Sequence, residues 1–507
     1  MRIRLIILSL IATFRVFGQC PEFSNTITLT SQALVDAFVS DYPNCEELDN
    51  SLIIGHFGAP VSTDINDLSG LSSLKRVYGE LRVRNVDLIE SFEGLNNIEY
   101  VEGDLTISDN ELLRNLNDFK HIDSLGRDFD ILNNPSLEVL FEEDSILFIG
   151  ATLRIKNNSN LSQISGFKKL RSIEGDLEIA GNTELISTVG FDNLESINGT
   201  LDIYDSPQLE NLNGFEMLTL INDGMEIRST AITDFTGLNS LHQINGRLQG
   251  NSVSITNNQN LLSLNGLESL DSIQRSFFLL DNERLESIAA LSNLRYIGGR
   301  LSILNSSLSE ITSLSSITPI AASVEIGENP NLVSLDQLPL ADKIDGSIEI
   351  RDNISLIDIT SVANVDTVLG RLFIEDNISL SDCNSLCPLL TTGFVEILTV
   401  IRDNLGNCET EDILTLICTT STSTEDVNEK QTFEIFPNPT EGIVNIKSLF
   451  SIREAIILRA DGSIVDFLKF DDDQFEVKLD ARDYESGLYL VELVSNGKRV
   501  VNKFVKH

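Results

Sequence analysis

The feature that most constrains this chain is a repeat of 24 residues. Residues 175–203 read GDLEIAGNTELISTVGFDNLESINGTLDI, so one Gly-x-Leu-x-Ile unit returns as the next after 24 residues. The first apolar residue of each unit keeps this spacing, apart from one step of 28, which places a four-residue insertion near 249–252, and one step of 23. Self-similarity at such a period predicts a solenoid in which each repeat is one coil. The aligned positions are Leu81, Leu105, Phe129, Leu153, Leu177, Leu201, Met225, Val253, Phe277, Leu301, Val324, Ile348 and Leu372.

Each unit reads as one strand followed by turns. Leu177 and Ile179 alternate with Asp176 and Glu178, and this period of two predicts a strand with one buried face. The second half of the unit, as in residues 190–199, has glycines at both ends and is short, which favours turns and short strands over a helix. One coil cannot bury its own leucines and isoleucines, so the coils must stack around a continuous core. About fifteen coils fit between Leu52 and Val395.

A small polar residue follows each strand, three residues after its isoleucine. Side chains stacked in register at this position can bond the turn backbone of their own coil and of the next one. We therefore expect a buried polar ladder along the solenoid. Its members are Asn110, Asn134, Asn158, Asn182, Ser206, Thr230, Asn258, Asn282, Ser306, Asn329, Asn353 and Asn377.

The start of the chain predicts export. Arg2 and Arg4 precede a short apolar run, and Val16 and Gly18 form a small-residue cleavage site, so residues 1–18 read as a secretory signal peptide. Six cysteines fit an oxidising compartment. They lie at the two ends of the repeat, where we expect disulfide-bonded caps, and the connectivity among the last four stays open. The cysteines are Cys20, Cys45, Cys383, Cys387, Cys408 and Cys418.

Charge and motifs exclude several classes of function. A formal net charge of −41 argues against a nucleic-acid partner, and no apolar run is long enough for a transmembrane helix. Cys383 and Cys387 in CNSLC raise the question of a metal site, but no histidine lies near them, and a secreted context favours disulfides. The four histidines are far apart, and no nucleophile elbow, zinc motif or phosphate loop is present, so we expect no catalytic residues, metal or cofactor. Whether calcium binds stays open.

The candidate ligand-binding residues are outward-facing positions on the regular strand. Stacked coils would place them on one broad sheet; those singled out are Arg154, Lys156, Tyr204, Phe278, Arg351 and Phe373, with Arg82, Arg84, Glu178, Arg228 and Glu349 on the same face. A binding scaffold should show dispersed charges here, whereas an enzyme should show a groove where carboxylates converge. The alternatives to a recognition scaffold are a polysaccharide-acting lyase or hydrolase on a β-helix and a structural surface-layer component.

The coil pattern, with Cys20-Pro21 and Asn44-Cys45 at its start and a cysteine-rich close, resembles the receptor L domain over about residues 20–418. The resemblance implies a right-handed, leucine-rich-repeat-like β-helix that serves as a rigid extracellular platform for binding. This chain departs from that family in having more than twice its usual number of coils, so a hormone-binding role is not carried over.

The C-terminal segment has a different composition. A polar stretch, TTSTSTEDVNEK, leads into strand-like runs with Asp461-Gly462 and Asn496-Gly497 between them, which predict hairpins in a small β-sandwich. The segment resembles the type A C-terminal sorting domain of the type IX secretion system of Bacteroidetes. The resemblance implies passage through the outer membrane, removal of the tail within 419–431, and then surface attachment or release. The matching residues are Pro437, Asn438, Pro439, Gly442, Gly487, Tyr489 and Lys503.

The sequence therefore predicts an all-β-dominated protein with four parts. Residues 1–18 are a signal peptide, 19–418 a right-handed parallel β-solenoid with disulfide caps, 419–430 a polar linker, and 431–507 an immunoglobulin-like sorting domain. We expect a secreted or surface-displayed, non-catalytic recognition or adhesion scaffold. Its expected partners are the type IX secretion machinery and an extracellular protein or glycan.

Overall fold

The computed structural model describes residues 20–21, 26–56, 62–246, 252–421, 433–459, 463–495 and 498–507. The predicted signal peptide, the insertion near 249–252 except Ser252, and most of the predicted linker lie outside these residues. The chain forms two compact units. One runs to Leu380 and includes Pro388–Asn404; the other consists of Ser381–Cys387 and Leu405–His507.

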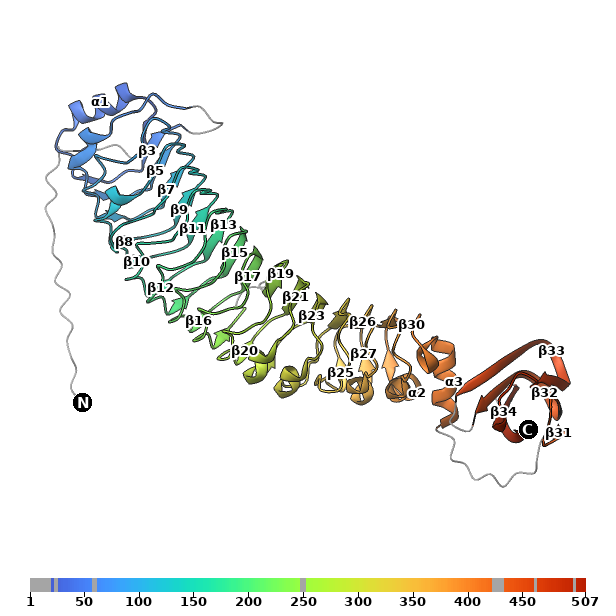
Figure 1. Ribbon diagram of the computed structural model, residues 1–507. Helices are drawn as coiled ribbons and strands as arrows, with labels where there is room; N and C mark the ends of the chain where they lie inside the picture. The colour runs from blue at the N-terminus through green and yellow to red at the C-terminus, as the bar shows by residue number, and fades with distance from the viewer. Residues whose placement is uncertain are drawn as a thin grey trace, which may run out of the picture. The chain divides into compact units, whose positions relative to one another are not determined.

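Within the described residues, the first unit is built on one parallel sheet of 16 strands, here called the long sheet (Figure 1). Each strand pairs with the strand of the next coil, as in Leu153↔Leu177 and Leu177↔Leu201, which confirms the predicted 24-residue register. Its strands, in spatial order, are β1 (Ile27–Leu29), β3 (Leu52–Gly55), β5 (Leu81–Arg84), β7 (Leu105–Ser108), β9 (Phe129–Leu132), β11 (Leu153–Lys156), β13 (Leu177–Ala180), β15 (Leu201–Ser206), β17 (Met225–Thr230), β19 (Val253–Thr256), β21 (Phe277–Asn282), β23 (Leu301–Ser306), β24 (Val324–Gly327), β26 (Ile348–Arg351), β28 (Arg371–Glu375) and β30 (Leu398–Arg402).

A second series of two-residue strands runs along the other side of the coils (Figure 1). The first sheet of this series, here called the short-strand sheet, contains β2 (Glu47–Leu48), β4 (Arg76–Val77), β6 (Tyr100–Val101), β8 (Ser124–Leu125), β10 (Phe148–Ile149), β12 (Ser172–Ile173), β14 (Ser196–Ile197), β16 (Leu220–Ile221), β18 (Gln243–Ile244), β20 (Ser272–Ile273) and β22 (Tyr296–Ile297). A separate sheet contains β25 (Lys343–Ile344), β27 (Thr367–Val368) and β29 (Phe394–Val395).

The second half of most coils forms turns, as predicted, but some coils wind into short 3₁₀ helices that the sequence pattern did not separate from turns. These are η1 (Ser69–Ser73), η2 (Asn117–Phe119), η3 (Ala289–Asn293), η4 (Thr312–Ser316) and η5 (Thr360–Asn364). Between the two sheets, a buried phenylalanine recurs in successive coils. The rings of Phe167, Phe191 and Phe215 stack with centroids 5.3 Å apart at each step. This ring stack adds favourable aromatic contacts to the burial of the leucines and isoleucines.

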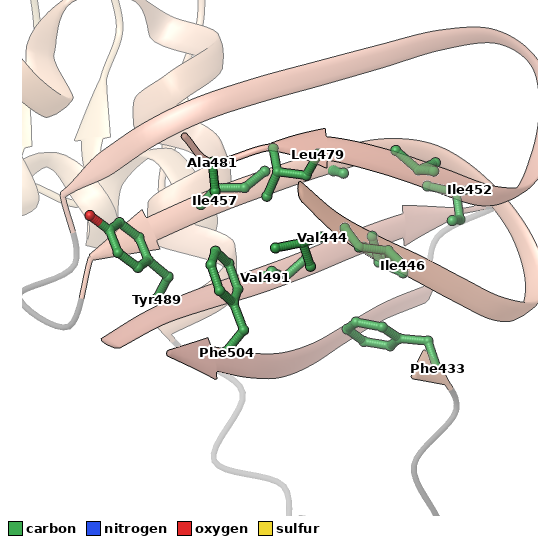
Figure 2. Packing of buried hydrophobic residues seen from close by; sticks show 13 residues of the cluster. Phe433, Val444, Ile446, Ile452, Ile457, Leu479, Ala481, Tyr489, Val491 and Phe504 are labelled. Atoms are coloured by element: carbon green, nitrogen blue, oxygen red, sulfur yellow. The ribbon is translucent and has the colours of Figure 1, made fainter. Parts of the chain in front are cut away.

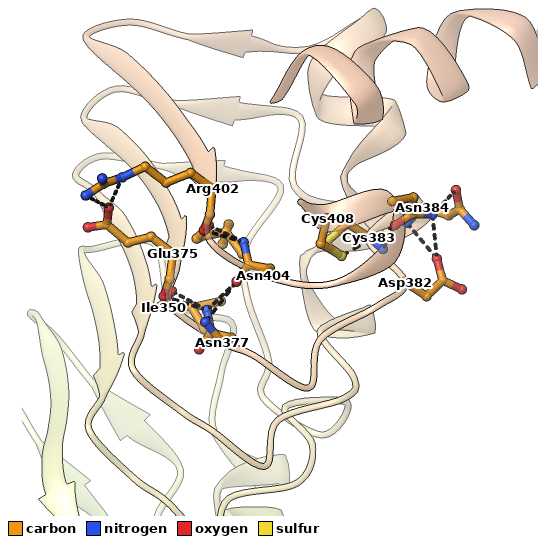
Figure 3. Close-up of a disulfide and its surroundings, with 11 residues drawn as sticks. Ile350, Glu375, Asn377, Asp382, Cys383, Asn384, Arg402, Asn404 and Cys408 are labelled. Atoms are coloured by element: carbon orange, nitrogen blue, oxygen red, sulfur yellow. Dashed lines mark hydrogen bonds and ion pairs between the residues drawn. A yellow bond between two sulfur atoms is a disulfide. The ribbon is translucent and has the colours of Figure 1, made fainter. Parts of the chain in front are cut away.

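The predicted polar ladder is present and buried. The side-chain oxygen of Asn158 accepts from the backbone N–H of Asn134 at 3.0 Å and from its amide at 3.2 Å, while the Asn158 amide donates to the Ile131 carbonyl at 2.9 Å. Near the end of the solenoid, Asn377 bonds Asn404 in the same way (Figure 3). Asn404 extends the ladder one coil beyond the predicted members. Backbone groups that the turns leave unpaired inside the coils are thus satisfied.

The residue before each ladder position has a left-handed backbone conformation. Asp109, Asn133 and Asn157 have φ of 54–56°, and the equivalent residue of the next coil is Gly181. Asparagine and aspartate tolerate this conformation better than other residues with a side chain. The frequent Asn or Asp at this position is therefore a backbone requirement of the turn.

The two ends of the solenoid sequence carry disulfides. Cys20 pairs with Cys45, and the chain between them contains α1 (Gln32–Asp41). Ser31 caps this helix, and the Gln32 side chain donates to the Asp67 carbonyl at 3.0 Å. The sequence pattern did not predict this helix. In the second unit, Cys383 pairs with Cys408 (Figure 3) and Cys387 with Cys418, so the cysteines of CNSLC are not joined to each other.

The C-terminal disulfides lie among short helices: η6 (Asn384–Leu386), α2 (Cys387–Thr391), η7 (Gly406–Cys408) and α3 (Glu411–Ser421). Helix α3 ends at Ser421, so the first three residues of the predicted polar linker are its last turn. Glu411 and Asp412 lie in the first turn of α3, where carboxylates favour helix formation.

Residues 433–507 fold as an antiparallel sheet that curves around its own core (Figure 2). Its strands are β31 (Phe433–Phe436), β32 (Ile443–Arg459), β33 (Ile464–Asp480), β34 (Gly487–Ser495) and β35 (Lys498–Lys506). Strand β32 pairs with three others, and its register shifts let it bend. The predicted hairpins are confirmed by pairing between β32 and β33 and between β34 and β35. The core includes Phe433, Val444, Ile457, Tyr489 and Phe504.

Candidate ligand-binding face

The outward-pointing side chains of the long sheet form the candidate face. In a typical strand such as β11, Leu153 and Ile155 are buried, while Arg154 and Lys156 are half-buried and point outward. The register stacks the second residue of each strand into one row and the fourth residue into a parallel row. We call these two rows together the outer face.

All six singled-out ligand residues lie on the outer face, but they do not form one cluster. Arg154, Phe278 and Phe373 belong to the row of second residues, and Lys156, Tyr204 and Arg351 to the row of fourth residues. Lys156 and Tyr204 are brought together, with the Lys156 nitrogen 3.1 Å from the tyrosine oxygen. Phe278 on β21 and Phe373 on β28 remain four strands apart.

The charged residues are distributed over many coils of this face, and several of them form ion pairs. The Arg154 guanidinium lies 2.8 Å from Asp128 and 2.9 Å from Asp130. Burial alone would lower the pKa of Arg154, but its bonds to these two carboxylates raise it. Lys156 lies 2.6 Å from Glu178, and Tyr204 donates to the same carboxylate. These contacts hold long side chains in one conformation.

Tyr204 is held from both sides of its strand. The guanidinium carbon of Arg228 lies 4.8 Å from the centre of its ring, in position for a cation–π interaction. Arg228 also forms ion pairs with Asp205 at 2.8 Å and Glu226 at 3.0 Å. An arginine stacked on an aromatic ring and paired with carboxylates is therefore already part of this surface.

A second charged group lies further along the face, around Glu325 on β24. This carboxylate is buried and bonds Arg351 at 3.0 Å, Ser302 at 2.7 Å and also Arg300. Burial raises the pKa of Glu325, but the hydrogen bonds and arginine charges outweigh it and lower the pKa. Sequence reasoning missed Glu325; its place in the row of second residues, between arginines of neighbouring coils, was the available signal.

The face is hollowed where β15, β17, β19 and β21 lie side by side. In the row of second residues, Asp202, Glu226, Ser254 and Phe278 follow one another on these four strands. Small serines separate the carboxylates from the aromatic ring and leave a hollow of about 300 Å³. Its lining is Thr200, Asp202, Gly224, Met225, Glu226, Ser252, Ser254 and Phe278. Of these, sequence reasoning singled out only Phe278.

Asp202 is the most perturbed carboxylate in the hollow. Burial, with the nearby charges of Glu226, Asp176 and Glu178, raises the pKa of Asp202 to about 6, against the effect of a hydrogen bond from the Thr200 hydroxyl. That hydroxyl lies 2.7 Å away. Among the described residues, no lysine or arginine forms an ion pair with Asp202, although Glu178 and Glu226 beside it are both paired. The ionised form of Asp202 is therefore disfavoured in the folded protein.

The Asp202→Asn variant is expected to be more stable than the wild type at pH 7.5. Because the folded-state pKa is raised, the wild type loses stability as pH rises from the unfolded value of 3.8 through about 6, and asparagine does not titrate. The gain is on the order of 1–3 kcal/mol at pH 7.5 and roughly half of that at pH 5. Urea unfolding of the wild type and the variant at both pH values measures the difference in the free energy of unfolding. Glu349→Gln, in the same row, is the control. An equal gain in both variants, or one independent of pH, would contradict it.

The sorting-motif residues are placed together at one end of the C-terminal sheet. The Asn438 amide donates to the Lys503 carbonyl at 2.9 Å, and the Val505 N–H donates to the Asn438 oxygen at 2.9 Å. Asn438 thereby fixes the turn with Pro437 and Pro439 to β35. Gly487 begins β34 in the same sheet, and Tyr489 is buried with its ring stacked on Phe504 at 5.3 Å. Gly442 accepts from the Ala481 N–H at 2.8 Å.

Comparison with known families identifies the C-terminal domain. Residues 434–507 match the model of the secretion system C-terminal sorting domain. The tail is a sorting domain. The protein is therefore a substrate of type IX secretion that is secreted or attached to the cell surface. In the described part of the chain, no helix has the length and apolarity to cross a membrane.

The solenoid also has a family match. Residues 175–290 match the Receptor L domain, and this stretch contains every residue that lines the hollow. A comparison with curated proteins finds no match. The family match accounts for the coil architecture in the middle of the solenoid.

Proposed function

We propose that this exported protein is a non-catalytic recognition scaffold that binds an extracellular protein or glycan on the outer face of the long sheet. The proposal combines a sorting domain, which delivers its cargo outside the cell, with a solenoid that resembles an extracellular binding platform. The sorting domain itself carries no information about the ligand.

The observation that carries the proposal is the network of ion pairs and hydrogen bonds on the outer face. Its arginines, lysine and tyrosine are held by ion pairs and hydrogen bonds, as in the Arg154 and Lys156 contacts at 2.6–2.9 Å. Side chains fixed before binding lose little conformational entropy when a ligand arrives. The aromatic rings of Tyr204 and Phe278 are half-buried on the same surface, and such rings favour contacts with proteins and sugars.

A test of this proposal blocks the face with one bulky side chain. Ser254→Trp places an indole in the hollow, and Ser272→Trp makes the same change on β20 of the short-strand sheet. Both serines are half-buried, so the two substitutions are matched. Screening the full-length protein against extracellular glycans and surface proteins should identify a ligand that Ser254→Trp no longer binds and Ser272→Trp still binds. Ligands lost only with Ser272→Trp would overturn the proposal.

One observation favours a second candidate, a polysaccharide-acting hydrolase. Asp202 and Glu226 are direct neighbours on adjacent strands, and glycosidases use a pair of carboxyl groups as their catalytic residues. The pKa of Asp202, near 6, suits a general acid, and the ion pair with Arg228 suits a charged Glu226. Release of reducing ends from a polysaccharide by the wild type, lost in Glu226→Gln, would support this candidate over the scaffold.

A further inference from the structure

The hollow on the outer face contains a carboxylate, Asp202, that forms no ion pair among the described residues. Several other carboxylates near this face are paired with a cation from the chain itself: Arg154 pairs with Asp128 and Asp130, and Arg228 with Asp205 and Glu226. Asp202 has only the Thr200 hydroxyl among the described residues. A half-buried carboxylate without a cation gains from any positive group that enters the hollow.

The opposite wall of the hollow is aromatic. Phe278 lies two strands from Glu226, and Ser254 occupies the position between them. Because serine is small, the ring and the two carboxylates face a common space of about 300 Å³. An arginine side chain fits this arrangement, since its guanidinium can donate hydrogen bonds to the carboxylates while its apolar stem packs against the ring.

The same surface shows this pairing with the chain's own arginines. Arg228 stacks on Tyr204 at 4.8 Å while it bonds Asp205 and Glu226, and Arg371 stacks on Phe373 at 5.7 Å. The hollow offers similar partners: Asp202, which forms no ion pair among the described residues, Glu226 beside it, and a phenylalanine. Guanidinium binds carboxylates in a planar, bidentate way that ammonium does not.

We propose that the hollow is a binding site for a guanidinium group, supplied by an arginine side chain of the partner protein that the outer face recognises. This inference rests on the proposed recognition function and specifies its chemistry. The formal net charge of −41 favours encounters with a basic partner surface, and the hollow gives one of its arginines a defined position.

Binding by this site depends on pH in a defined direction. The groups that face Asp202 are Glu178 on β13, Asp176 just before it, and Glu226 on β17; the nearby cations Lys156 and Arg228 are engaged with Glu178 and Glu226. Below pH 6 Asp202 is protonated and attracts a guanidinium less strongly. Affinity for arginine should therefore fall as the pH is lowered from about 8 to about 5.

Calorimetry on the full-length protein tests the site with the blocked peptide Gly-Arg-Gly and the same peptide carrying citrulline, a neutral side chain of the same shape. We expect saturable binding of the arginine peptide at about 0.1–10 mM and at least about tenfold weaker binding of the citrulline peptide. Asp202→Asn should weaken arginine binding about tenfold, and Glu349→Gln, which removes one charge from the same row, should leave it within about twofold. Equal loss in the two variants would show only nonspecific attraction to an acidic surface and would overturn the site.

An independent measurement uses the absence of tryptophan from the chain. Phe278→Trp keeps an aromatic wall and creates a single fluorescent reporter in the hollow, and Phe373→Trp creates a matched reporter elsewhere in the row. The arginine peptide should change the emission of the first and not of the second; the reverse, or no change in either, would overturn the site.

The same variants separate the two proposals. If Ser254→Trp blocks a partner that Asp202→Asn still binds with full affinity, the proposed arginine site is wrong and the proposed recognition function is retained. If neither variant affects partner binding, both fail.

Discussion

Deletion of residues 434–507 is expected to reduce the protein found at the cell surface and in the medium by more than about tenfold, with the remainder trapped inside the cell envelope. The reason is that the deletion removes the whole export signal, because the motif residues lie together on this one folded domain. Asn438 bonds the backbone of β35, and Tyr489 packs on Phe504. Quantifying the protein in cells, on cell surfaces and in the medium measures the effect.

The control for this deletion is the transfer of the tail to another protein. Residues 433–507 joined to an unrelated periplasmic protein should carry that protein out of the cell, which separates loss of the signal from misfolding of the solenoid. Intact mass of the exported protein also shows whether cleavage falls within the predicted 419–431. Unchanged export of the truncated chain would contradict the assignment of the tail.

Replacement of one ladder residue is expected to have the largest effect on stability. Asn158→Ala leaves the buried backbone N–H of Asn134 without its acceptor and removes the bond that the Asn158 amide donates to the Ile131 carbonyl. Buried groups left unpaired cost about 1–3 kcal/mol each, so the loss should be on the order of 3 kcal/mol. Thermal unfolding, together with faster hydrogen exchange at the Asn134 amide, measures the loss.

The matched control lies on the surface of the next coil. Asn193 is exposed, and its amide also donates to a backbone carbonyl, that of Lys168, at 2.7 Å. Water can replace this bond, so Asn193→Ala should cost less than about 1 kcal/mol. Equal losses in the two variants would mean that the ladder does not differ from an ordinary surface hydrogen bond.

The parts of the fold that repeat could be predicted from the sequence. A fixed period places equivalent residues in register, so Leu177 over Leu201 and Asn158 beside Asn182 follow directly from the spacing. The elements that occur once were missed. Helix α1 and the connectivity of the last four cysteines depend on local contacts at the ends of the repeat, where no periodic pattern constrains them.

The candidate site was predictable only in part. The repeat showed that Arg154, Lys156, Tyr204 and Phe278 share one face, because alternation fixes which side chains point outward. The hollow was not predictable from any single coil, because it is formed by the equivalent residues of four successive coils. These are two carboxylates, a serine and a phenylalanine in one row. Likewise, the raised pKa of Asp202 results from burial and from acids on neighbouring coils.

The measurement that tests the central claim most directly is the dissociation constant of the first ligand found, compared between Ser254→Trp and Ser272→Trp. If the outer face of the long sheet is the recognition surface, the change at Ser254 should weaken binding by at least about tenfold, and the change at Ser272 by less than about twofold. Equal affinities, or weakening confined to Ser272→Trp, would contradict the claim and place the binding surface elsewhere on the protein.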